Sequence, residues 1–192
     1  MSVWLDLIGS FVFGSLLVLN VIRMNADITV QSYKSAMVYM AQDNAATLAE
    51  IVEDDFQKMG YGVADTAITL ADSSQIRFLA DLGADGTVDT LYYYLSSPTL
   101  ANHTVNPADR ILYRKRNGDT PQDFPMGITV FALSYFNADG DSLALPVTPG
   151  EVRQIRVDIT AESREPYRTT SQDTTYARAF MQIRIRPRNL GP

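Results

Sequence analysis

Residues 3–25 read VWLDLIGSFVFGSLLVLNVIRMN, and this stretch decides how the chain is organised. Between Val3 and Ile22 the only charged side chain is Asp6. Twenty helical residues at a rise of ~1.5 Å each span roughly 30 Å, which is the thickness of the hydrocarbon core of a bilayer. The stretch therefore predicts an apolar helix that can enter a membrane, with a carboxylate near its start. No Lys or Arg precedes the apolar run, and a cleaved secretory signal normally carries a basic segment there.

Residues 25–59 contain neither proline nor glycine and continue the helical pattern. Apolar residues recur there at steps of three and four, as on one face of an amphipathic helix. They are Tyr33, Met37, Met40 or Ala41, Ala45, Leu48, Ile51 or Val52, Phe56 and Met59. The acids between them, Asp43, Glu50, Glu53, Asp54 and Asp55, are expected on the polar face. Because Gly60 and Gly62 supply a stop signal, we predict one continuous helix over residues 3–59.

After Gly62 the hydrophobic period changes from 3.6 to 2, which is typical of strands. The predicted strands are 74–82, 87–95, 110–116, 128–136, 152–160 and 176–186, with 110–116 expected at a sheet edge. The segments 96–109, 116–126 and 162–175 are predicted to be loops. The expected fold class is α+β, a long N-terminal helix with a protruding apolar half, packed on an antiparallel sheet. Its expected parts are residues 1–24 (apolar half-helix), 25–60 (amphipathic half-helix on the sheet) and 61–192 (sheet domain).

Composition excludes several classes of function. The chain has 192 residues, a formal net charge of −6 and a pI of about 4.7. An acidic surface repels phosphates, so we expect no nucleic-acid partner. The chain has no cysteine, which excludes disulfides, thiolate metal sites and cysteine nucleophiles. No base and orienting partner accompany any serine or the single histidine, His103, so we expect no enzyme and no catalytic residue.

The segment DLGADGTVD, residues 81–89, is the one candidate for a metal site. Asp81, Asp85 and Asp89 partly resemble a calcium loop, in which oxygens at alternating positions surround the ion. Gly83 and Tyr92 occupy two positions where that loop needs ligands. The alternative is a hairpin turn built on Asp85 and Gly86. We therefore expect no cofactor, with calcium as a weak candidate at these three carboxylates.

Two surface patterns in the strands bear on contacts with other chains. The run Tyr92–Tyr93–Tyr94 must place at least one ring in the core and another on the opposite face. Arg178, Arg184 and Arg186 alternate along the last strand and are expected on its solvated face. One hypothesis is that these arginines pair with Glu50, Glu53 and Asp54 of a neighbouring copy.

Several quoted stretches together resemble one family. LAEIVEDDFQKMGYG (48–62) is similar to the helix end of PilW-type minor pilins and J-type pseudopilins of type II secretion. SSQIRFLADLGADGTVDTLYYYL (73–95) resembles their first hairpin, and VRQIRVDITAES with the final RIRPRNL resembles their last strands. The likeness covers nearly the whole chain, which thus resembles the type IV pilin-like proteins.

This resemblance implies a non-enzymatic structural subunit of a type IV pilus-like filament or pseudopilus. Such a subunit is held in the inner membrane first, and then assembles with copies of itself or other pilins into a fibre at the cell surface. The implied assembly residues are Trp4, Asp6, Gly9, Phe11, Phe13, Gly14 and Leu16. Small residues in this stretch, Gly9 and Gly14 with Ser10 and Ser15, let helices approach closely.

The resemblance also implies a role for Asp6. In the family, an acid at the fifth mature position pairs with the free α-amino group of an adjacent subunit. Asp6 becomes fifth if Met1 is removed, which the small neighbour Ser2 permits. The family's basic leader does not precede the apolar run, so the numbering either starts at the mature end or the chain is inserted without that processing. A lone carboxylate in hydrocarbon costs several kcal/mol, so pairing Asp6 with a positive charge of the adjacent subunit would fix the register in which subunits add.

Two alternatives stay open. Asp6 could lie at the level of the lipid headgroups beside Trp4, an interfacial residue type. The whole chain could be a membrane-anchored extracytoplasmic binding module that does not polymerise. Whether a filament subunit is the major or a minor component is also open.

Overall fold

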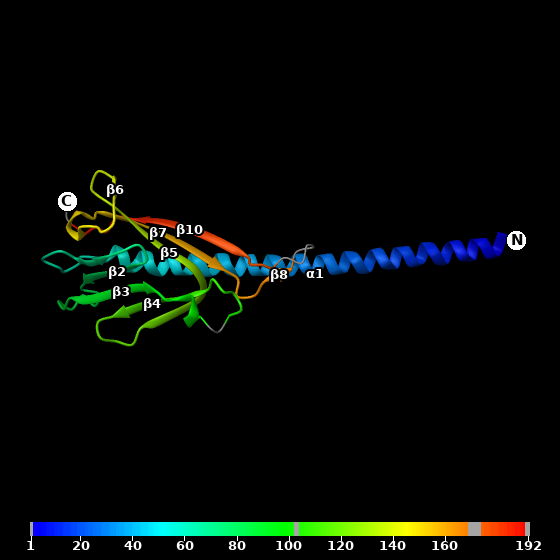
Figure 1. Cartoon of the computed structure of the whole chain (residues 1–192), viewed down its shortest axis with the longest axis horizontal. Coiled ribbons are helices and arrows are strands. Elements are labelled where there is room, and N and C mark those ends of the chain that lie inside the picture. The colour runs from blue at the N-terminus through cyan, green and yellow to red at the C-terminus, as the bar shows by residue number, and fades with distance from the viewer. Residues whose placement is uncertain (1, 102–103, 169–173, 191–192) are drawn as a thin grey trace. The chain divides into compact units, whose positions relative to one another are not determined.

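The computed structural model describes residues 2–101, 104–168 and 174–190, and its fold class is the expected α+β. A single long helix, α1 (Ser2–Gln57), is followed by an antiparallel sheet (Figure 1). The chain divides into two compact units, Met1–Met37 and Val38–Pro192. Unit 1 is the N-terminal part of α1, and unit 2 contains the rest of the helix and all the strands.

Helix α1 ends close to where the glycines predict. Its last residue is Gln57, and Gly60 and Gly62 follow with φ of +81° and +71°. These are left-handed conformations that glycine adopts without a Cβ penalty. The backbone N–H of Gly60 then donates to the carbonyl of Leu79, which ties the helix end to the sheet.

The helix buries its apolar stripe in unit 2 only from Ala41 onward. Tyr33 and Met40, expected in this stripe, are 41% and 58% exposed. The side chains of α1 that reach the core are Ala41, Ala45, Leu48, Ala49, Val52 and Phe56, and Met59 follows them. The segment expected to pack on the sheet began at residue 25, and the first buried side chain of the helix, Ala41, lies 16 residues later.

The main sheet is antiparallel throughout, in the order β1-β2-β3-β4-β5-β7-β10, with β6 paired to β5. Its strands are β1 (Ile68–Ala71), β2 (Gln75–Ala80), β3 (Asp89–Leu95), β4 (Arg110–Arg116), β5 (Gln122–Phe136), β6 (Ser142–Leu143), β7 (Gln154–Glu162) and β10 (Arg178–Ile185). Short 3-10 turns occur at Pro98–Leu100 and Pro149–Glu151. The six predicted strands are all present; β4 has the predicted bounds, and the other five differ from the prediction at one or both ends.

Three expectations about the sheet are wrong. Strand β4 lies between β3 and β5 and is no edge strand. The predicted loop 116–126 contains the first part of β5, and the predicted loop 162–175 contains the hairpin of β8 (Tyr167–Arg168) and β9 (Thr174–Thr175). Strands that are short or rich in charged residues show little hydrophobic alternation. They can be assigned only from their backbone hydrogen bonds to neighbouring strands.

Strand β5 is long enough to pair with two different strands and bends between them. Its first part pairs with β4 (Leu112↔Phe124), and its second part pairs with β7 (Leu133↔Val157). Gly127 lies at the bend with φ of +71°, and a Cβ built on it would be 2.2 Å from the Glu162 carbonyl oxygen. The bend curls the sheet around the helix (Figure 1).

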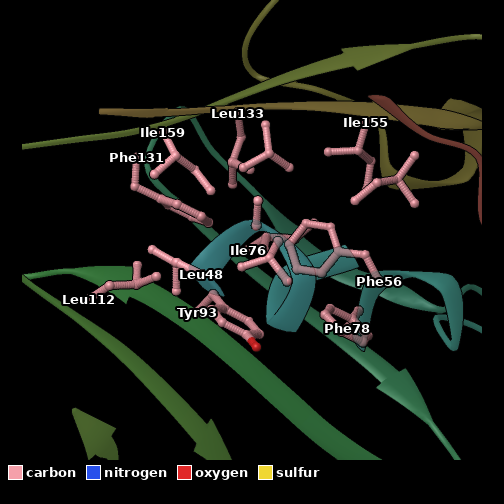
Figure 2. Packing of buried hydrophobic residues seen from close by; sticks show 14 of the residues in the cluster. Leu48, Phe56, Ile76, Phe78, Tyr93, Leu112, Phe131, Leu133, Ile155 and Ile159 are labelled. Atoms are coloured by element: carbon pink, nitrogen blue, oxygen red, sulfur yellow. The ribbon is translucent and has the colours of Figure 1, made fainter. Parts of the chain in front are cut away.

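One core joins the helix to the sheet. The ring of Phe56 meets Phe78 and Tyr93 edge-on, with ring centroids 5.5 and 5.6 Å apart (Figure 2). Tyr93 is fully buried, whereas Tyr92 and Tyr94 stack on each other on the opposite face of the sheet. This confirms the prediction that the tyrosine run supplies both faces.

Candidate functional site

The apolar part of α1 in unit 1 exposes every large side chain that the sequence assigns to assembly. Trp4 and Phe11 are each 75% exposed, Phe13 is 73% and Leu16 is 51%. Among the described residues one helix, α1, is long enough and apolar enough to span a membrane. Its most apolar 18-residue window has a mean hydropathy of 2.0 and is 0% buried.

Gly9 and Gly14 have no packing role within the chain. A Cβ built on either glycine meets nothing within 4 Å. Glycine in a helix interior costs roughly 0.5–1 kcal/mol relative to alanine. The two glycines therefore weaken the isolated helix without filling any requirement of its own fold.

Polar side chains in this half of the helix bond to its own backbone. Ser15 Oγ donates to the Phe11 carbonyl at 2.8 Å, and Asn20 Nδ2 donates to the Leu16 carbonyl at 3.0 Å. Such bonds satisfy polar groups where no water is available. Asp6 differs, because it has no hydrogen bond or ion pair with any other described residue, and its side chain is exposed.

Unit 2 contains a buried ion pair that sequence analysis missed. Asp55, expected on the polar face of the helix, is only 5% exposed. Its carboxylate accepts hydrogen bonds from Arg114 Nε at 2.6 Å and Nη2 at 3.0 Å, and from the hydroxyl of Tyr93. These partners lie on β4 and β3, so the cluster fastens the helix to two strands.

The electrostatics of this cluster follow from burial and charge. Its hydrogen bonds to Asp55 raise the pKa of the Arg114 guanidinium above its ordinary value. Burial raises the pKa of the Tyr93 hydroxyl, and the nearby Asp55 charge adds to the effect. These shifts favour a charged guanidinium on Arg114 and a neutral phenol on Tyr93, which suits a structural clamp between the helix and the two strands.

In the loop that contains Asp81, Asp85 and Asp89, carboxylates accept hydrogen bonds from other groups of the protein. Asp81 accepts hydrogen bonds from the N–H groups of Asp85 and Gly86 at 3.1 and 2.9 Å. The Asp89 carboxylate is held by Arg116 Nη2 at 2.7 Å and by Asn117 Nδ2 at 2.6 Å. Their donation lowers the pKa of the Asp89 carboxyl, with Arg116 as the largest cause.

The described residues contain no group of three or more His, Asp or Glu side chains placed to hold a metal ion. Gly86 takes φ of +83° at the turn between β2 and β3, the connection that the hairpin alternative predicts. His103 lies outside the described residues, as does Met1.

A hollow of about 410 Å³ opens beside the clamp. Glu50, Ile51 and Asp54 of α1 form one wall, and Arg114, Gln122 and Phe124 lie on the strand side with the edge of Asp55. Two further hollows lie in unit 2, which we call the head: one of about 290 Å³ between residues 63–68 and Arg153, and one of about 310 Å³ that is lined by Asp139, Glu151 and Arg153.

Two observations now stand together: a long helix with a bare apolar half, and an antiparallel sheet clamped to its other half. The architecture is pilin-like. Comparison of the chain with protein-family models, curated proteins and solved structures found no match. The pilin-like arrangement therefore rests on the elements and their packing alone.

Proposed function

We propose that this pilin-like chain is a structural subunit of an extracellular type IV pilus-like filament or pseudopilus, and that it assembles through the apolar half of α1. One observation carries the proposal. The apolar half of the helix buries none of its most hydrophobic window, while unit 2 has a complete core of its own. The exposed half contributes no side chain to that core, so in this proposal it serves contacts outside the chain.

The hydrophobic effect supplies the driving force. Large apolar side chains left in water cost free energy in proportion to their area, so the exposed stretch needs either lipid or other copies of itself. Lipid meets this need while the chain resides in the inner membrane, and neighbouring helices meet it in a fibre core. In this proposal the partners are copies of the chain or other pilins.

The glycines favour helix contacts over simple anchoring. A lipid anchor gains nothing from Gly9 and Gly14, which lower helix propensity and have open space around them. Close approach of a second helix does need small residues. Ser10 and Gly14 follow Asp6 at steps of four, so all three share one side of the helix.

Asp6 acts as the register device in this proposal. Its carboxylate has no partner among the described residues and sits in the most apolar stretch of the chain. A partner from another subunit, the α-amino group that the family resemblance implies, would neutralise it in the fibre core. A carboxylate left unpaired there costs several kcal/mol, so subunits out of register would be rejected.

The test is charge reversal of Asp6 in the full chain, expressed in its native cells. We expect Asp6→Lys to remain in the membrane fraction and to vanish from the sheared extracellular fraction. Asp27→Lys is the matched control, since it makes the same charge change on an exposed site beyond the apolar run. Unchanged release of Asp6→Lys fibres would contradict the role of Asp6. If the unaltered chain is never released, the anchored binding module becomes the better account.

A further inference from the structure

We infer that the heads of neighbouring copies dock head-to-tail through a guanidinium site: the acidic hollow beside the Asp55–Arg114 clamp receives arginine side chains that follow β10 in the next copy. This inference rests on the proposed filament function and adds the contact that the heads make.

The hollow keeps an excess of negative charge after its internal pairs are counted. Asp55 neutralises Arg114, which leaves Glu50 and Asp54 on the helix wall. Lys58 pairs with Asp54 at 2.5 Å, but both side chains are exposed, at 46% and 66%. An exposed pair of this kind is weak and readily exchanged. Glu50 has no hydrogen bond or ion pair with the described residues.

The chemistry of the hollow suits a guanidinium better than an ammonium. Ile51 and Phe124 give its wall an apolar part, and Glu50 offers a carboxylate at its rim. A guanidinium is planar and weakly hydrated, so it lies against apolar groups and still donates two parallel hydrogen bonds to a carboxylate. An ammonium is more strongly hydrated and donates from a single point. We therefore assign the site to an arginine side chain.

The chain carries a matching set of arginines at its other end. Arg184, Arg186 and Arg188 are exposed and alternate with Ile185 and Pro187, which are buried. We call these three residues the arginine strip. Arg178, on the same strand, is excluded because it pairs with Glu162 at 2.6 Å.

The strip is partly held in place and mostly unpaired. The Arg184 guanidinium lies 4.2 Å from the centre of the Phe136 ring, which limits its freedom. Arg186 and Arg188 have no hydrogen bond or ion pair within the described ranges. A cluster of three unopposed positive charges is notable in a chain with a net charge of −6.

Charge complementarity and placement identify a second copy as the occupant. Figure 1 shows β4, beside the hollow, and β10, which leads into the strip, on opposite sides of α1 within the head. One head can therefore receive arginines on one side and offer them on the other. Two different surfaces that meet in this way form a heterologous contact, and repetition of such a contact builds an open helical fibre.

The chain offers a clean cross-linking test, because it has no cysteine. Fibres are sheared from cells that express Glu50→Cys/Arg186→Cys, oxidised, and run on a denaturing gel without reductant. We expect a ladder of covalent multimers, since each copy joins one neighbour through each cysteine. Glu50→Cys alone and Arg186→Cys alone should run as monomers. Monomers from intact double-variant fibres would overturn the inference.

Charge reversal provides the second readout. Like charges placed opposite each other at an interface cost several kcal/mol, so Glu50→Arg or Arg186→Glu should lower fibre yield at least about tenfold. Combined in one chain, they should restore most of the yield. Asp139→Arg, in the exposed turn after β5, is the matched control and should leave the yield unchanged.

The two proposals fail differently. If the unaltered chain forms no fibres, the filament function fails and this contact with it. If fibres form and neither the single reversals nor their combination alters the yield, only the head contact fails.

Discussion

Asp55 and Arg114 form a two-pronged ion pair between helix α1 and strand β4, with Arg114 Nε 2.6 Å from one carboxylate oxygen and Nη2 3.0 Å from the other. The Asp55 side chain is 6% exposed and that of Arg114 is 24% exposed. Asp55 lies near the C-terminal end of the buried stripe of α1, one residue before Phe56. It therefore fixes the rotation of the helix against the sheet as well as its distance.

Removing one partner of the clamp should be costly. We expect Asp55→Asn to lower the free energy of unfolding by about 3 kcal/mol, because Arg114 would keep its charge beside a neutral amide. Replacing both partners, as Asp55→Leu/Arg114→Met, should cost less than the two single changes added together. Chemical unfolding of the full chain in detergent, followed by circular dichroism, measures the three values.

The exposed pair Asp54–Lys58 is the matched control for the clamp. It joins neighbouring positions one helical turn apart, and both side chains are largely in solvent. Asp54→Asn should change the free energy of unfolding by less than about 1 kcal/mol. Equal losses for Asp54→Asn and Asp55→Asn would show that the burial of Asp55 adds nothing to stability.

The glycines of the apolar half should separate chain stability from assembly. We expect Gly9→Ala/Gly14→Ala to strengthen the isolated helix, since each change removes a helix penalty of roughly 0.5–1 kcal/mol. Gly14→Leu should also fold normally, because open space surrounds the site. Amide hydrogen exchange in detergent measures the stability of the helix.

Fibre yield from the same variants is the opposing measurement. Gly14→Leu should reduce the yield sharply, since the larger side chain would hold neighbouring helices apart. Ala26→Leu, an exposed position beyond the apolar run, is the control. Normal fibres from Gly14→Leu would show that no helix approaches this face closely.

The bend of β5 should tolerate no side chain at Gly127. Gly127→Ala combines a left-handed φ, costing roughly 1–2 kcal/mol, with a Cβ 2.2 Å from the Glu162 carbonyl oxygen. Relieving that overlap should cost about 1–3 kcal/mol more. Gly86→Ala has a similar φ of +83° with nothing within 4 Å, so it should show the backbone cost alone. Equal thermal midpoints for the two variants would contradict this reading of the bend.

The Asp89 carboxyl should make the head sensitive to acid. Its pKa is lowered below 3.8 by Arg116 and Asn117, so the folded state favours the charged form. The contribution to stability is complete above that ordinary value and is lost as the pH falls through the lower folded value. Asp89→Asn should therefore flatten the dependence of the unfolding free energy on pH below about pH 4. Denaturant titrations across that range measure it.

A remaining slope is expected in that variant, because hydrogen bonds from Gln75 and from the Ser73 backbone also lower the pKa of Asp72. An unchanged slope in Asp89→Asn would mean that Arg116, whose side chain is 41% exposed, gives Asp89 no preference for its charged form.

Hydrophobic periodicity predicted the elements of this fold that carry their apolar side chains along one face. The apolar run, the helix stop at Gly60 and the strands around Ile76 and Ile159 all appear where the pattern places them. The position of β4 was not predictable, since its charged residues pair with specific partners across the sheet. Without knowledge of those partners, the charged residues of this strand indicate an exposed edge of the sheet.

Asp55 shows the limit most clearly. It follows Asp54 in the sequence, and both read as members of a polar face. In the helix, Asp54 points toward solvent and Asp55 toward the core. The buried carboxylate of Asp55 is stabilised by Arg114, which lies 59 residues later in the sequence. The apolar run that holds the candidate assembly residues is visible in the sequence, and their role in assembly stays a prediction, whereas the hollow beside Asp55 depends on which strands meet the helix.

Electron microscopy of material sheared from cells that express the unaltered chain tests the central claim most directly. The account predicts regular fibres that contain this chain, with residues 3–24 packed as helices along the fibre axis and the sheet domain outside. A sheared fraction without fibres, with all of the chain retained in the membrane, would contradict it.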